Sequence, residues 1–323
     1  MIDIGMTPAA PTLADVFDTI DDHELSPGAI ASGFAVLDNA LSGGFHPGDV
    51  TLIGGGPGVG KTIATLQMAR SMALDGREVA YVCYEHGDRA LLARLLLLEL
   101  GEMGASRSDV IDATEAIWRV AHGEAHWSVL ASRHLVLRAA QSKVGQYADN
   151  LMVVEGSATL GLPELVELTD RIQPAVLFVD YLQKVPAENL SGNNRVTAAV
   201  EGLKNLALAT GTAVIAVVAG TRAGLEERRL RLHHLRGAEA LAYEADVVVL
   251  LNEKSAAVSR RHSAFDAVRS KDFGRWTVFS VEKNRHGPAG LNVEFMKDFA
   301  TFRFVADGRF VEERLIDGTS ETD

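Results

Sequence analysis

Residues 50–62 read VTLIGGGPGVGKT, and the rest of the chain can be organised around this stretch. Residues 55–62 satisfy the spacing G-x-x-x-x-G-K-[ST] of a phosphate-binding loop. Glycines let the backbone N–H groups of such a loop point at phosphate oxygens, and the following helix adds the positive end of its dipole. Lys61 can reach the β- and γ-phosphates, and the Thr62 hydroxyl can ligate Mg²⁺. The stretch predicts an ATP–Mg²⁺ site made of Gly55, Gly56, Pro57, Gly58, Val59, Gly60, Lys61 and Thr62.

The segments around this loop alternate between strand-like and helix-like patterns. Apolar, β-branched runs bounded by turn residues are typical of strands buried on both faces. We therefore expect an α/β fold with a mostly parallel twisted sheet, helices on both faces and an antiparallel extension at one edge. The expected strands are residues 50–54, 78–85, 151–155, 175–180, 213–219 and 246–252, with 276–283, 291–297 and 301–305 forming the antiparallel edge.

Composition limits the classes of function. The 323 residues allow one elaborated domain or two, and the formal net charge of -12 means that any nucleic-acid contact must come from a local basic patch. Cys83 is the only cysteine, which excludes a disulfide framework and a four-cysteine zinc module. No secretory leader pattern opens the chain, and residues 95–98, the most apolar run, are far shorter than the roughly 20 residues of a membrane span. We expect a cytoplasmic protein.

The remaining segments suggest a simple domain plan. Residues 1–28 are expected to hold a disordered start, a short helix and a linker, with the apolar face of the helix (Leu13, Val16, Phe17, Ile20) packing either on its own domain or on a neighbouring subunit. Residues 29–312 form the main domain. Within it, residues 87–146 are mostly helical, with Leu91, Leu92, Leu95 and Leu98 on one buried face, and residues 255–274 are a surface insertion. Residues 313–323 are expected to be a solvated tail.

Two carboxylates close apolar strands. Ligands in open parallel sheets bind beyond the carboxyl ends of the strands, so an acidic residue at such an end is a candidate for the site. Asp180 ends the run AVLFVD and is expected to hold Mg²⁺ together with Thr62. Glu85 ends the run VAYVCYE and is the candidate general base for the water that attacks the γ-phosphate. The alternative for Glu85 is a solvated strand end.

Several further motifs carry a family resemblance. They are residues 32–34 (SGF), 37–38 (LD), 43–49 (GGFHPGD), 180–183 (DYLQ), 203–207 (LKNLA), 214–216 (VIA), 235–236 (LR), 245–248 (ADVV) and 283–288 (KNRHGP). Together with the phosphate-binding loop, they resemble the RecA-like P-loop ATPase domain of DnaB-type replicative helicases, in the right order, over roughly residues 12 to 305. The last motif is also similar to the KNR-x-G motif of RadA recombination proteins.

The resemblance implies a ring, usually a hexamer, with ATP bound between subunits and single-stranded DNA in the channel. Lys283 and Arg285 would then reach the γ-phosphate of the neighbouring subunit. The residue pattern is compatible, because side chains two apart on a strand project to the same side. An arginine supplied in trans makes hydrolysis depend on assembly. A pair of solvated cations on an edge strand is the alternative.

The chain departs from the family at positions that couple ATP to DNA. The strand that follows Val214 ends in Val218 and Ala219, where the family carries a Ser-Gln pair that senses the γ-phosphate. The DNA-facing loop reads RGAE over residues 236–239 instead of RESG. Because so few residues precede residue 29, we also expect no separate helical domain of the kind that replicative helicases carry.

Residues 221–236 decide whether the chain binds DNA. This segment holds five arginines and two histidines against two glutamates, which suits contact with a phosphate backbone in a central channel. The candidate DNA contacts are Arg222, Arg228, Arg229 and Arg236. A mobile, solvated basic loop is the alternative interpretation.

Two hypotheses follow. The first is an ATP-hydrolysing ring motor, a helicase or translocase of the DnaB type that acts on single-stranded DNA, with a loader or regulatory protein as a possible partner. The second is a RadA-like or KaiC-like ATPase in which nucleotide orders an assembly and no strands are separated. The basic segment favours the first, and the altered residues 218–219 and 237–239 favour the second.

Overall fold

The fold is described from a computed structural model, in which residues 12–14, 28–187, 190–259 and 272–316 are described. One nine-stranded sheet runs through the domain, in the order β3-β2-β4-β5-β1-β6-β7-β8-β9. The parallel strands are β1 (Val50–Gly55), β2 (Val79–Cys83), β3 (Leu151–Glu155), β4 (Val176–Asp180), β5 (Ala213–Ala219) and β6 (Val247–Glu253). The antiparallel strands are β7 (Trp276–Asn284), β8 (Asn292–Asp298) and β9 (Arg303–Phe310). The expected α/β fold and its antiparallel edge are confirmed.

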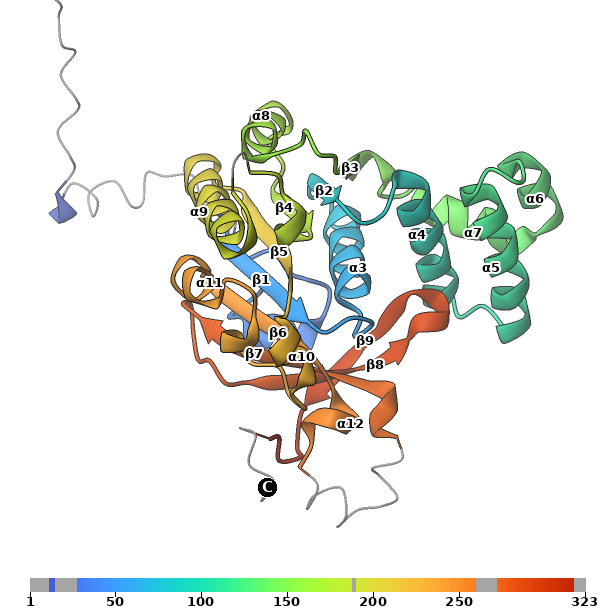
Figure 1. Ribbon diagram of the computed structural model, residues 1–323. Coiled ribbons are helices and arrows are strands. Elements are labelled where there is room, and N and C mark those ends of the chain that lie inside the picture. The colour runs from blue at the N-terminus through green and yellow to red at the C-terminus, as the bar shows by residue number, and fades with distance from the viewer. Residues whose placement is uncertain (1–11, 15–27, 188–189, 260–271, 317–323) are drawn as a thin grey trace, which may run out of the picture.

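Helices cover both faces of the parallel part (Figure 1). The first face is covered by α3 (Lys61–Leu74) and α4 (Asp88–Glu102), and the second by α8 (Leu162–Ile172), α9 (Gly192–Thr210) and α11 (Ala238–Glu244). Shorter helices are α2 (Ala35–Ala40), α10 (Arg222–Glu226) and α12 (Lys254–Ala257). The inner parallel strands β1, β2, β4, β5 and β6 are rich in valine, leucine and alanine because both of their faces are buried.

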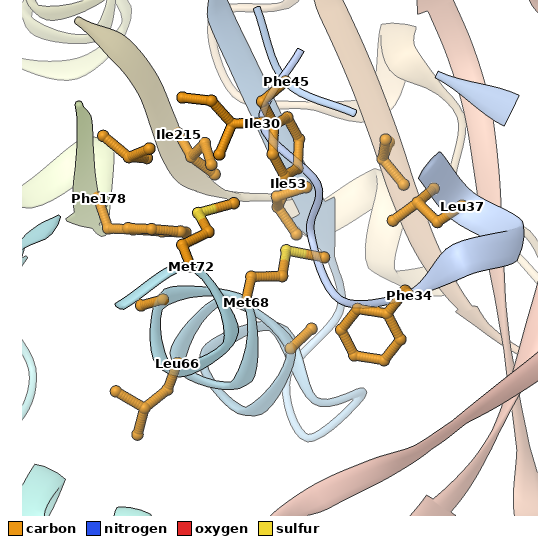
Figure 2. Packing of buried hydrophobic residues seen from close by; sticks show 14 of the residues in the cluster. Ile30, Phe34, Leu37, Phe45, Ile53, Leu66, Met68, Met72, Phe178 and Ile215 are labelled. Carbon is orange, nitrogen blue, oxygen red and sulfur yellow. The ribbon is translucent and has the colours of Figure 1, made fainter. Parts of the chain in front are cut away.

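β1 is the middle strand of the sheet, between β5 and β6, and all of its residues are buried. Its first face packs on α3, where Met68 and Met72 contact the cluster that contains Ile53 (Figure 2). Methionine side chains are flexible and fill irregular space between a helix and a twisted sheet. This packing holds the carboxyl end of β1 and the first turn of α3 in a fixed relation.

The segment after β2 is helical, as expected. It forms α4, α5 (Arg107–Ala121), α6 (Trp127–Arg133) and α7 (Leu135–Val144). α5 and α7 pack on the side of α4 that faces away from the sheet, and α6 packs on α7 (Figure 1). The expected buried face is corrected at one position: Leu91, Leu95 and Leu98 are buried, but Leu92 is 47% exposed. The α4 helix lies between two cores, so its burial is wider than a single stripe.

The start of the expected tail is also corrected. Glu313, Leu315 and Ile316 are at most 8% exposed, and the Ile316 N–H donates to the Ala257 carbonyl at 2.9 Å. Leu315 joins a small cluster with residues 257, 258, 273 and 278, so each described part of the expected surface insertion contributes buried apolar residues. Residues 260–271 and 317–323 lie outside the described residues, as do residues 1–11 and 15–27, where the disordered start and most of the docking helix were expected.

Helices in the described part of the chain are all too short or too polar to cross a membrane.

Candidate active site

The phosphate-binding loop connects β1 to α3 with a tight backbone. Gly60 immediately precedes the helix and has φ of +101°, in the left-handed region that favours glycine. A Cβ at Gly60 would lie 2.6 Å from Phe304 and 2.7 Å from Phe299, so the position also has no space for a side chain. The first N–H groups of α3 point beyond the carboxyl end of β1, where an anion is favoured.

Thr62 and Asp180 meet at this edge of the sheet. The Thr62 hydroxyl donates to Oδ2 of Asp180 at 2.7 Å, and Asp180 is only 1% exposed. Burial raises the pKa of Asp180 above its ordinary value of 3.8, while the hydrogen bonds it accepts oppose that rise. The second oxygen, Oδ1, is buried and has no hydrogen-bond partner among the described residues. A buried acceptor without a donor, beside a threonine hydroxyl, fits a hydrated Mg²⁺.

Lys61 and Glu85 lie around the same cavity of about 460 Å³. The Lys61 ammonium donates to the carbonyl of Gly56 at 2.8 Å, so it lies within the curl of the loop. Burial lowers the pKa of Lys61 from 10.5, and the charges of Asp180 and Glu85 oppose that shift. Glu85 follows β2 and is exposed to the cavity, where a water molecule can reach it. The structure therefore brings together Lys61, Thr62, Glu85 and Asp180.

An aromatic and cationic wall closes the other side of the cavity. It consists of Phe299 and Phe302, in the turn between β8 and β9, and Arg94 from α4. The Arg94 guanidinium lies 5.5 Å from the centre of the Phe302 ring, and its Nε and Nη1 are buried without a hydrogen-bond partner among the described residues. Phe302 has φ of +49°, which is uncommon for a bulky residue. Sequence reasoning missed these three residues, because no motif places this turn beside the phosphate-binding loop.

The two substituted residues at the end of β5 face opposite sides of the sheet. Ala219 lines the cavity, whereas Val218 is fully buried in the second core. Gln183, three residues after Asp180, exchanges hydrogen bonds with the backbone of Ala219, at 3.2 Å to its N–H and 3.3 Å to its carbonyl. The Ala219 side chain cannot donate to a phosphate, but Gln183 ties the end of β5 to the segment that carries Asp180.

Lys283 and Arg285 lie at the opposite end of the sheet. Arg285 lies beside Asp246, because its N–H donates to the Asp246 carbonyl. The phosphate-binding loop begins at Gly55, which pairs with Leu251. Asp246 and Leu251 are five residues apart along the extended chain of β6, which corresponds to about 16 Å. This separation is beyond the reach of an arginine side chain. The structure therefore does not bring these two cations to the phosphate-binding loop of their own subunit.

Within the subunit, both cations are held by the end of α11 and by Asp246. The Lys283 ammonium donates to the Ala242 carbonyl at 2.7 Å, and Arg285 donates to the Tyr243 carbonyl at 2.7 Å and to Asp246 Oδ1 at 2.8 Å. Lys204 of α9 donates to the other oxygen of Asp246 at 2.7 Å. Burial lowers the pKa of Lys283, as does the neighbouring charge of Arg285.

The basic segment 221–236 is packed against the domain. The N–H and the hydroxyl of Thr221 both donate to the His234 carbonyl, at 2.8 and 3.0 Å, and so close the segment. In its middle, the Leu230 N–H donates to Asn252 Oδ1 of β6 at 2.7 Å. Its ends are therefore joined and its centre is anchored, in contrast to the expected alternative of a loop surrounded by solvent.

Arg229 corrects the predicted set of DNA contacts. It is 8% exposed, and its guanidinium donates to the Ile316 carbonyl at 3.1 Å and to Asn292 Oδ1 at 2.9 Å. Glu282 Oε1 lies 3.8 Å away. The charge of Arg229 is thus used inside the domain. The other three predicted contacts, Arg222, Arg228 and Arg236, are exposed.

Gly237 follows Arg236 and begins α11. It has φ of +78°, and a Cβ there would lie 2.9 Å from Val196 of α9. The chain therefore requires glycine at this altered position of the family motif. Because α11 starts beside Arg236 and its last turn holds Lys283, one short helix links the basic segment to the two cations.

Comparison with known proteins adds to this geometry. The family model described as the DnaB-like helicase C terminal domain matches residues 29–304. A "Replicative DNA helicase DnaB" from Rickettsia bellii is 27% identical over 311 residues, covering 88% of this chain and 58% of that protein. A "DNA repair protein RadA" from Mycobacterium tuberculosis is 42% identical over only 66 residues, which is 20% of this chain and 13% of that protein.

Solved structures support the same fold. The one described as "The Structure Of A DnaB-Like Replicative Helicase And Its Interactions With Primase" superposes with a TM-score of 0.66 at 21% identity, covering 91% of this chain and 65% of that one. A second, of an isolated ATPase domain, has a TM-score of 0.67 at 21% identity and covers 91% of this chain and 96% of that one.

The chain spans about 58–60% of the length of the DnaB and DnaC helicases it matches. The family model nevertheless covers most of this chain, and within the matched span a phosphate-binding loop contacts a strand-end carboxylate. The extent of the match, together with this geometry, shows that the chain belongs to the DnaB-like helicase C-terminal domain family.

Proposed function

We propose that this chain is the ATP-hydrolysing ring motor of a DnaB-like helicase and acts on single-stranded DNA. The observation that carries the proposal is the convergence of Lys61, Thr62, Glu85 and Asp180 on one cavity at the carboxyl end of the parallel strands. We assign the motor to residues 29–316, which include the family match over residues 29–304 and the packed start of the expected tail.

Four residues of the cavity, Lys61, Thr62, Glu85 and Asp180, are assigned roles in hydrolysis. Lys61 binds the β- and γ-phosphates, and Glu85 orients the attacking water and accepts its proton. Thr62 and Asp180 would hold Mg²⁺, because the Thr62 hydroxyl lies beside Asp180 and Asp180 Oδ1 has no hydrogen-bond partner among the described residues. Bound Mg²⁺ offsets the negative charge on the phosphates during transfer.

The nucleoside end of ATP is expected at the aromatic part of the wall, Phe299 and Phe302. Arg94 interacts with the charges of Asp180 and Glu85, so it lies toward the phosphate end of the cavity. Its guanidinium is therefore proposed to contact phosphate oxygens of bound ATP.

Lys283 and Arg285 are proposed to act on ATP held by the next subunit. They lie at the end of the sheet away from their own phosphate-binding loop, which suits a head-to-tail contact between copies. A closed ring, such as a hexamer, gives every site one loop and one pair of cations. To reach the phosphate, Arg285 must leave Asp246 and Tyr243, so assembly exchanges bonds within a subunit for bonds across the interface.

Arg222, Arg228 and Arg236 are proposed to contact the DNA backbone, and Arg229 is not. A ring that carries six copies of the three exposed arginines would present a positive channel in an acidic particle. Contacts of this kind depend on phosphates and suit binding that is independent of sequence. A loader or regulatory protein is a further proposed partner.

The second candidate function is a RadA-like or KaiC-like ATPase that does not separate strands. It is favoured by Ala219, which cannot report the γ-phosphate through its side chain, and by the internal use of Arg229.

The two functions are separated by ATP hydrolysis measured with and without single-stranded DNA at low and moderate salt. A DNA motor predicts a several-fold, salt-sensitive stimulation that falls in Arg236→Ala. The matched control is Arg138→Ala, which removes an exposed charge from α7, far from the segment. Equal hydrolysis with and without DNA would reject the DNA motor in favour of the second candidate.

A further inference from the structure

One buried hydroxyl beside the magnesium site has no role in the mechanism above. Tyr81 lies in the middle of β2, is 0% exposed, and donates its hydroxyl hydrogen to Oδ2 of Asp180 at 3.1 Å. Its oxygen also lies 2.9 Å from the hydroxyl of Thr65, one turn into α3. A hydroxyl chain thus connects α3, β2 and β4 behind the phosphate-binding loop.

The direction of the hydrogen bonds in this chain follows from Asp180. An ionised carboxylate only accepts hydrogen bonds, so Tyr81 must donate to Asp180 and can accept from Thr65. Thr62 donates to the same oxygen, Oδ2, at 2.7 Å. Both donors therefore converge on Oδ2, and none of the described residues donates to Oδ1.

The hydroxyl of Tyr81 is not needed to place its ring. The ring stacks on Phe178 with centroids 5.4 Å apart, and Tyr81 pairs with Phe178 in the strand register. The Thr65 hydroxyl already gives the buried Tyr81 hydroxyl a hydrogen-bond partner. The additional bond to Asp180 instead restricts rotation of the carboxylate.

We propose that Tyr81 is a positioning residue that, with Thr62, holds Oδ2 of Asp180 and so directs Oδ1 toward the hydrated Mg²⁺ of bound ATP. This inference rests on the proposed function, because it assigns Asp180 to Mg²⁺. Residues that orient a metal ligand typically change metal affinity or activity by about 10- to 100-fold when they are removed. For one hydrogen bond of 3.1 Å, we expect the lower end, about 10-fold.

Tyr81→Phe tests the proposal because it removes one oxygen and keeps the stacked ring. Binding of Mn²⁺ is followed by electron paramagnetic resonance in the presence of a non-hydrolysable ATP analogue, and binding of the analogue alone is measured in EDTA. We expect Mn²⁺ affinity to fall about 10-fold while analogue affinity in EDTA stays at the wild-type value.

Tyr84→Phe is the matched control. It removes a tyrosine hydroxyl from the same segment, but that hydroxyl donates to the Leu160 carbonyl at 2.6 Å and does not contact Asp180. Its Mn²⁺ affinity should equal that of the wild type. Thermal melting of both variants reports any general loss of stability. A purely structural role of Tyr81 would lower the melting temperature without a selective loss of Mn²⁺ affinity.

The outcomes separate this inference from the proposed function. If the wild type binds Mn²⁺ with the analogue and Tyr81→Phe binds it equally well, the positioning role is wrong and the ATPase assignment stands. If both ligands weaken equally in Tyr81→Phe, the hydroxyl serves general packing and the positioning role is again wrong. If the wild type itself binds no Mn²⁺ with the analogue, the proposed function is wrong.

Discussion

Replacing Arg229 with methionine should destabilise the fold and leave DNA binding nearly unchanged. The side chain is 6% exposed, its Nη1 donates to the Ile316 carbonyl and its Nη2 to Asn292, and it lies near the buried carboxylate of Glu282. Methionine keeps the aliphatic stem but leaves these acceptors without their charged donor. Glu282 retains Arg231, 2.9 Å away, as a partner.

The size of the effect follows from burial. Each of the two acceptors that lose their donor, the Ile316 carbonyl and Asn292 Oδ1, costs about 1–3 kcal/mol, or about 2–6 kcal/mol together. With an unfolding entropy of about 2.1 cal/mol/K per residue, a chain of 323 residues loses about 3–9 °C of melting temperature. Stability is measured by thermal unfolding of the wild type and the variant. DNA binding is then measured by titration with fluorescent single-stranded DNA, at a fixed temperature below both melting points.

The matched variant is Arg222→Met, which removes an exposed arginine of the same segment. It should melt within about 1 °C of the wild type, because an exposed substitution usually changes stability by less than 0.5 kcal/mol or so. It should also weaken DNA binding and lower the slope of log affinity against log salt by about 0.7. The reasoning would be refuted if Arg229→Met melted like the wild type but lost DNA affinity as Arg222→Met does.

Three further predictions concern stability and the nucleotide site. Lys254 is fully buried beside Glu294, and Lys254→Met should lower the free energy of unfolding by about 3–5 kcal/mol in a denaturant titration. Gly60→Ala adds a Cβ on a left-handed backbone and at less than 3 Å from other atoms, so an ATP titration should show binding weakened by about 2–5 kcal/mol. The Cβ of Gly58→Ala meets no atom within 4 Å, so the same ATP titration should show a loss of only about 1–2 kcal/mol. Burial raises the pKa of Asp246, but a lysine hydrogen bond and nearby cations outweigh it and hold the pKa below 3.8. The ionised Asp246 carboxylate therefore stabilises the fold above about pH 4, and this effect is lost as the pH falls. In Asp246→Asn, the free energy of unfolding should consequently change less with pH on the acid side.

The sheet and the centre of the site could be predicted because their signals are local. The run 213–219 is continuous and apolar, and its expected bounds agree with those of β5. The last expected strand, 301–305, is instead Arg303–Phe310. Asp180 and Lys61 could be paired from the sequence, because motif spacing and the position of ligands at strand ends are general rules. Each rule concerns one strand and the segment that directly follows it in the sequence.

The rest depended on contacts between distant segments. Arg229 looked like any other arginine of a basic segment, and its burial comes from β8 and from Ile316, far along the chain. Phe302 reaches the phosphate-binding loop only because β9 returns beside α3. The action of Lys283 and Arg285 in trans stays a prediction from resemblance, and the register of β6 with β7 shows only that both residues lie away from the phosphate-binding loop of the same chain.

The most direct test of the account is a subunit-mixing experiment. Lys61→Ala removes the lysine of the phosphate-binding loop, and Arg285→Ala removes the cation proposed to act on the neighbouring subunit. Each variant alone should lose nearly all ATP hydrolysis, since an arginine acting in trans is worth about 10³–10⁵ in rate.

When the two variants are mixed, some interfaces combine an intact Lys61 from one copy with an intact Arg285 from the other. The account predicts that hydrolysis returns in the mixture, reaches a maximum near equal proportions and depends on total protein concentration. Two results together would contradict a site shared between subunits. Arg285→Ala alone would be fully active, and the mixture would hydrolyse no more ATP than the sum of the two variants measured separately.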